Sequence, residues 1–78
     1  MVLTEELAEE INLLALFNLA TTQEGIKVHA NAGPQVVAAA RRLYEKGIIS
    51  QVDGGYLTDL GIEVAEHAQR MLTILSAR

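Results

Sequence analysis

The chain has 78 residues, half of them hydrophobic, and a formal net charge of −4. This length suits one domain spanning residues 1–78, and the absence of cysteine excludes disulfides and thiolate metal sites. The longest apolar runs, such as residues 13–17, are too short to cross a bilayer, and the acidic N-terminus does not fit a secretory signal. We therefore expect a soluble, cytoplasmic protein without a membrane partner.

The basic residues are concentrated in the middle of the chain. Residues 25–50 carry four basic side chains and one acidic one, whereas the remainder carries two basic and nine acidic ones, so the local charges are +3 and −7. Such asymmetry fits a basic contact face on an acidic body. The alternative is a set of ordinary solvated cations on a surface helix.

A first helix is expected from Thr4 to about Leu19. Thr4 can cap it, and the helix dipole favours the acidic residues of the first turn. Apolar residues recur at helical spacing at Leu3, Leu7, Ile11 and Leu14. The solvated side is expected to consist of Glu5, Glu6, Glu9 and Glu10. No histidine is interleaved with these glutamates, so we expect no metal site there.

Two interpretations compete for residues 21–28. The stretch from Thr21 to Glu24 matches a capping box, which predicts a short helix beginning near Thr22. The apolar–polar–apolar alternation of residues 26–28 instead indicates a strand. We favour the short helix, followed by a turn over residues 29–33.

The central helix is expected over residues 34–46. Pro34 suits a first helical turn, and Gly47 suits a C-terminal cap. The buried face is expected to hold Val36, Val37, Ala40, Leu43 and Tyr44. Small residues and hydrogen-bond donors share the opposite face, at Gln35, Ala38, Ala39, Arg42 and Lys46. Arginine reads guanine or phosphate and glutamine can pair with adenine; alternatively, alanine simply favours helix and the face is ordinary solvent surface.

A short hairpin is expected after the central helix. Residues 48–52 and 56–57 predict two strands, joined by a turn at Asp53-Gly54-Gly55 because Asp-Gly is a favoured hairpin dipeptide. Thr58 can then cap a last helix that extends to about Leu75.

The last helix carries two apolar stripes. The first consists of Ile62, Ala65, Ala68, Leu72 and Leu75, and the second of Leu60, Val64, His67, Met71 and Ile74. One stripe can face the core while the other faces a second copy of the protein, as in a coiled-coil seam. The alternative is a small three-helix core that covers both stripes.

Motifs of the common enzyme and metal-site classes are missing from the sequence. There is no G-x-S-x-G and no phosphate-binding G-x-x-x-x-G-K. His29 and His67 lack the spacing of zinc ligands. We therefore expect no enzymatic activity, no cofactor and no metal.

A recognisable pattern runs through residues 34–62. It consists of Val36, Leu43, Gly47-Ile48-Ile49, Leu57-Thr58 and Gly61. This pattern resembles winged helix-turn-helix regulators of the MarR and PadR type. The whole chain also resembles a small family of uncharacterised bacterial proteins described as DNA-binding, in the stretches NLLALFNL, TTQEGIKVHANA and QVDGGYLT.

The resemblance implies a mainly α, winged helix-turn-helix-like domain with a small β-hairpin, acting as a transcriptional regulator. The helix over residues 34–46 would then recognise double-stranded DNA through Gln35, Ala38, Ala39 and Arg42. Phosphate contacts would come from Lys27, Arg41 and Lys46. The chain departs from the pattern because residues 22–28 replace the usual second helix and the wing, residues 50–56, has no arginine or lysine. The alternative function is a non-catalytic protein–protein interaction module that acts through the last helix, with a homodimer as one form of it.

Overall fold

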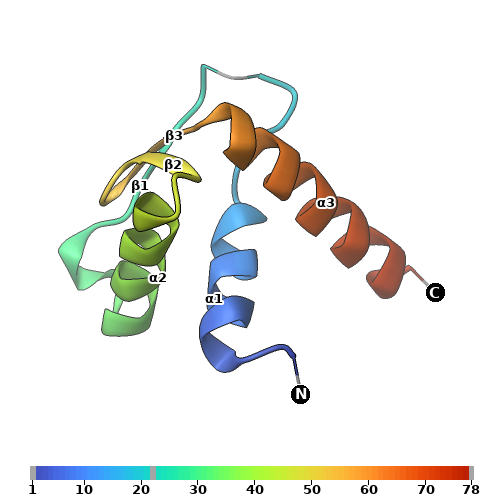
Figure 1. Cartoon of the computed structure of the whole chain (residues 1–78), viewed down its shortest axis with the longest axis horizontal. Helices are drawn as coiled ribbons and strands as arrows, with labels where there is room; N and C mark the ends of the chain where they lie inside the picture. Colours follow the sequence, from blue (N-terminus) through green and yellow to red (C-terminus); the bar gives the residue numbers. More distant parts are fainter. Residues whose placement is uncertain (1, 22, 78) are drawn as a thin grey trace.

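The computed structural model describes residues 2–21 and 23–77 of the chain. The elements follow in the order α1 (Glu5–Leu14), β1 (Ile26–Lys27), the 3₁₀ turn η1 (Ala30–Ala32), α2 (Pro34–Glu45), β2 (Ile49–Gln51), β3 (Gly54–Leu57) and α3 (Asp59–Ser76). Figure 1 shows α1 between α2 and α3, with the small sheet at the end of α2. The expected fold class is confirmed: the chain is mainly helical with a small antiparallel sheet, consistent with a winged-helix-like fold.

Helix α1 begins as expected and ends earlier than expected. The hydroxyl of Thr4 accepts a hydrogen bond from the Leu7 amide at 3.1 Å, which is the predicted N-cap. The chain tightens after Leu14, where the Phe17 amide donates to the Leu14 carbonyl at 3.3 Å in a 3₁₀-type bond. Gln69 of α3 donates from Nε2 to the carbonyls of Leu14 and Phe17, at 3.1 and 2.8 Å. The Leu14 carbonyl thus accepts two hydrogen bonds at the end of α1, and the Phe17 carbonyl, just beyond the helix, gains a partner from α3.

The favoured short helix after α1 is wrong, and the alternative strand is correct. Ile26 and Lys27 form β1 and pair antiparallel with Gly55 and Gly54 of β3. The pairing needs glycine on β3, because a Cβ at Gly54 would lie 2.3 Å from the Ile26 carbonyl oxygen. The expected helix start at Thr22 lies outside the described residues.

The sheet has the order β1-β3-β2, so the strand before the central helix joins the hairpin that follows it. The hairpin turns at residues 52–53, one position earlier than expected, and both glycines belong to β3. Gly54 and Gly55 have φ values of 127° and 76°, a region that favours glycine. Register shifts between Ile49 and Gln51 of β2 accompany this irregular strand.

The core-facing side of α2 differs from the expected one. Ala39, Ala40 and Leu43 are buried, whereas Val36 and Tyr44 are 37% and 46% exposed. The helix packs against α1 on one side and the sheet on the other, so its buried face is centred on Leu43 with an alanine on each side. Ala39 was therefore wrongly assigned to the exposed face: small side chains are needed where the helix approaches its neighbours on two sides.

Helix α3 begins at the predicted cap and lies on the sheet. The hydroxyl of Thr58 accepts from the Gly61 amide at 3.0 Å and donates to the Gly47 carbonyl at 2.6 Å. Gly61 allows close packing, since a Cβ there would lie 2.0 Å from the Ile48 carbonyl oxygen. Ala65 and Ala68 of the first stripe are buried, so the middle of this stripe faces the core, whereas Leu75 at its end is 70% exposed and does not.

Candidate functional site

Two surfaces carry the residues that the sequence singled out. The first is the charged side of α2, which was expected to contact nucleic acid. The second is the outer face of α3, defined here as Leu60, Val64, His67, Met71, Ile74 and Leu75.

Two cations of α2 are engaged by one carboxylate of α1. Glu10 Oε2 lies 2.7 Å from Arg42 Nε, and Glu10 Oε1 lies 2.5 Å from Lys46 Nζ. Arg42 also donates from NH2 to the backbone carbonyl of Glu6 at 3.2 Å. Glu10 is only 5% exposed, so its expected place on the solvated side of α1 is wrong. The α1–α2 contact covers it, and the two cations compensate its burial.

The ionisation of Glu10 follows from these contacts. Burial alone would raise the pKa of its carboxyl group, but hydrogen bonds from Lys46 and Arg42, together with their charges, lower the pKa below the ordinary value of 4.5. The same contact raises the pKa of the Arg42 guanidinium. Both shifts favour the charged forms of Glu10 and Arg42, and their ion pair joins α1 to α2.

A third cation, Lys27 of β1, forms an ion pair with Asp53 in the hairpin turn. The hydrogen bond from Lys27 lowers the pKa of the Asp53 carboxyl group. Both side chains are partly exposed, at 61% and 37%, so solvent screens the attraction. The pair ties β1 to the turn between β2 and β3.

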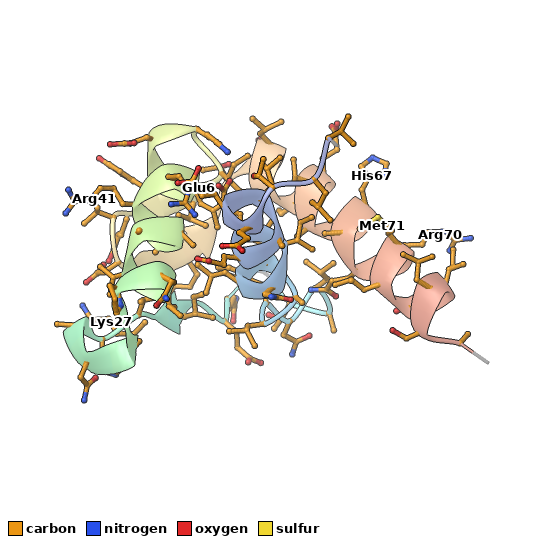
Figure 2. All side chains as sticks on the ribbon, turned by 90° about the horizontal axis from the view of Figure 1, so that it is seen from below. Glu6, Lys27, Arg41, His67, Arg70 and Met71 are labelled. Atoms are coloured by element: carbon orange, nitrogen blue, oxygen red, sulfur yellow. The ribbon has the colours of Figure 1, made fainter. Side chains whose placement is uncertain are left out.

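The remaining residues of the expected DNA contact are not brought together with these cations. Gln35 and Arg41 are exposed and Ala38 is half-buried, while Ala39 is buried at 1% exposure. Within residues 2–21 and 23–77, Arg41 takes part in no ion pair. Figure 2 shows Arg41 projecting from the side of α2 that faces away from α1. The exposed polar face of α2 is therefore narrower than expected.

The outer face of α3 presents large apolar side chains to solvent. Leu60, Met71, Ile74 and Leu75 are 50%, 43%, 59% and 70% exposed. His67 is also exposed, whereas Val64 is half-buried and packs against the core. The C-terminal part of this face forms a shallow hollow. In Figure 2, His67, Arg70 and Met71 project from α3 on the side away from α2.

In the part of the chain that the structure describes, no group of three or more histidine, cysteine or acidic side chains is placed to hold a metal ion. No helix within those residues combines the length and apolar character needed to span a membrane.

Comparison with known proteins assigns the chain to a family. The model of DUF5669, a family of unknown function, matches residues 1–76. The chain belongs to DUF5669. A search of curated proteins and a search of solved structures each returned no match. The function of this DUF5669 chain must therefore be argued from its own surfaces.

Two residues that organise the structure of this DUF5669 chain, Glu10 and Gln69, were not among those predicted from the sequence to be functional. A signal for Glu10 was available, because Arg42 and Lys46 stand four positions apart on one side of a helix and can share one carboxylate. No comparable signal existed for Gln69. Its role depends on how the end of α1 meets α3, which local sequence does not encode.

Proposed function

We propose that the protein is a non-catalytic protein–protein interaction module on a winged-helix-like scaffold, acting through the outer face of α3. The observation that carries the proposal is the exposure of Leu60, Met71, Ile74 and Leu75, which range from 43% to 70%. Met71, Ile74 and Leu75 line one shallow hollow, and Leu60 lies on the same side of the helix about three turns earlier. Exposed apolar surface of this kind marks interaction sites in proteins.

The charges of α2 favour this function over a nucleic-acid contact. Lys27, Arg42 and Lys46 are each paired with a carboxylate, so a phosphate would have to displace Asp53 or Glu10. If all four cations were free to contact phosphates, the logarithm of the DNA affinity would fall with the logarithm of the salt concentration with a slope of about −4 per protomer. With Arg41 as the one cation of the four that is unpaired within the described residues, the expected slope is about −1. The local charge of +3 is therefore mostly neutralised by the fold.

DNA binding is the second candidate function. It is supported by the winged-helix-like order of elements and by the exposure of Gln35 and Arg41 on α2. These two side chains have the donors that read base edges and phosphates. The resemblance to MarR- and PadR-type regulators points the same way.

Sedimentation velocity of the wild type and of Met71→Glu tests the interaction function. We expect the wild type to associate with increasing concentration and Met71→Glu to remain monomeric, because a carboxylate would be buried without a partner. Leu16→Glu is the matched control: Leu16 is apolar and 68% exposed on the chain that follows α1, and its substitution should leave association unchanged.

A fluorescence titration with duplex DNA at low salt tests the second candidate. Arg41→Ala is compared with Arg70→Ala, an exposed arginine on α3. A wild type that stays monomeric and binds DNA with an affinity that only Arg41→Ala reduces would replace the interaction function with DNA binding.

A further inference from the structure

We propose that the partner of the α3 outer face is a second copy of this chain, with the two α3 helices packed antiparallel. Glu63 of each copy then lies beside Arg70 of the other. The inference rests on the proposed function and specifies the partner and its orientation.

The seam residues of α3 repeat as they do in a two-helix coiled coil. Leu60, Val64, His67, Met71 and Ile74 are separated by alternating steps of four and three residues. Glu63 and Arg70 are seven residues apart and precede the equivalent seam residues Val64 and Met71, so they occupy the same heptad position and flank the seam on the same side. Both are exposed, and neither forms an ion pair among the residues that the structure describes.

Glu63 of one copy can meet Arg70 of the other only when the two α3 helices are antiparallel. An antiparallel pair with its two-fold axis between residues 65 and 66 sets Leu60 against Met71 of the second copy and Val64 against His67. Glu63 then meets Arg70 of the second copy, and the two-fold axis repeats the contact. A parallel pair would place Glu63 beside Ala68 and Arg70 beside Leu75, which carry no charge.

The position of α3 leaves room for a second helix. Figure 1 shows the C-terminal half of α3 running away from α1 and α2, and Figure 2 shows His67, Arg70 and Met71 on its outward side. Each copy carries a net charge of −4, so two copies repel at long range. The Glu63–Arg70 contacts offset that repulsion at the seam and fix the orientation, while the apolar residues supply the affinity.

Charge exchange tests the orientation directly. Glu63→Arg places arginine beside Arg70 of the second copy, and Arg70→Glu places glutamate beside Glu63. Each variant alone should associate at least about tenfold more weakly than the wild type, because like charges meet twice. An equimolar mixture of the two variants should recover association as a heterodimer, since opposite charges then meet at both contacts. Glu66→Arg, an exposed position off the seam, should behave as the wild type.

A cross-linking experiment gives a second measure of orientation that does not depend on the charge variants. The chain has no cysteine, so single cysteines can be introduced without background. Mixing Leu60→Cys with Met71→Cys should give a disulfide-linked heterodimer under mild oxidation. In a parallel pair each variant would instead cross-link with itself.

The outcomes separate this inference from the proposed function. A dimeric wild type and a monomeric Met71→Glu, with no recovery in the mixed charge variants and no mixed disulfide, would overturn the antiparallel arrangement alone. A wild type that stays monomeric up to millimolar concentration would overturn both this inference and the proposed function. Circular dichroism of each variant confirms that the fold is retained.

Discussion

Oε2 of Glu10 on α1 lies 2.7 Å from Nε of Arg42 on α2. This contact changes the functional meaning of the central helix, because Arg42 was one of the residues expected to contact DNA. The side chain of Arg42 is 24% exposed and that of Glu10 is 6% exposed, so the pair belongs to the packing of the two helices. Four predictions test how these long-range contacts hold the fold together.

The first prediction concerns the stability that Glu10 supplies. Glu10→Gln removes the carboxylate charge, leaves Lys46 without its ion pair and leaves Arg42 only the more distant carboxylate of Glu6, 3.9 Å from NH1. We expect the free energy of unfolding to fall by about 1–3 kcal/mol, less than for a fully buried pair because both cations are partly exposed. Urea denaturation measures the change. Glu66→Gln, the same substitution at an exposed position of α3, is the control and should change stability by less than about 0.5 kcal/mol.

The second prediction concerns the pH dependence of stability. The pKa of Glu10 is lower in the folded state than its ordinary value of 4.5. Its contribution is therefore complete above about pH 4.5 and is lost as the pH falls through the lowered folded-state pKa, since the unfolded chain then binds the proton more tightly. Glu10→Gln should flatten the dependence of the unfolding free energy on pH below 4.5. If the unfolding free energy of Glu10→Gln decreased at low pH as steeply as that of the wild type, other carboxylates would account for the loss of stability in acid.

The third prediction concerns the glycine in the first turn of α3. Alanine at position 61 would gain about 1 kcal/mol in helix propensity, but its Cβ would lie 2.0 Å from the Ile48 carbonyl oxygen. We expect Gly61→Ala to lose about 1–3 kcal/mol overall, because the helix must move away from the sheet. Thermal unfolding measures it against Thr73→Ala, which lies exposed in the same helix and should be neutral or slightly stabilising.

The fourth prediction concerns the amide of Gln69. Gln69→Ala removes the hydrogen bonds to the carbonyls of Leu14 and Phe17 at a partly buried site; the Leu14 carbonyl keeps its bond from the Phe17 amide, while the Phe17 carbonyl loses its partner. A loss of about 1–3 kcal/mol is expected. Gln35→Ala, also a helical glutamine but exposed, serves as the reference. Equal stability of the two variants would show that water replaces the Gln69 amide at no cost.

The helices and the hairpin were predictable because their signals are local. Thr4 and Thr58 cap α1 and α3 as predicted, and Pro34 opens α2. The correct interpretation of residues 26–28, a strand, could not be chosen from these residues alone. Strand β1 exists only through its pairing with Gly54 and Gly55, which lie further along the chain. The capping-box pattern was a true local preference that this pairing overrides.

The candidate site was less predictable than the fold. Helical spacing identified the exposed residues of α3, including Leu60 and Met71, because one helix face follows from sequence alone. Helical spacing did not identify the rotation of α2, which depends on packing against α1 and the sheet together. It therefore placed Ala39 at the surface and left Arg42 free, although both lie where α2 meets its neighbours.

The capping of α1 by Gln69 has a consequence for the order of folding. Ten residues are too few for a helix to persist alone in water. The groups that hold α1 in place are distant in sequence, Arg42 being 32 positions and Gln69 55 positions beyond the residues they bind. Helix α1 is therefore expected to form only together with α2 and α3, so the three helices should fold in one cooperative transition.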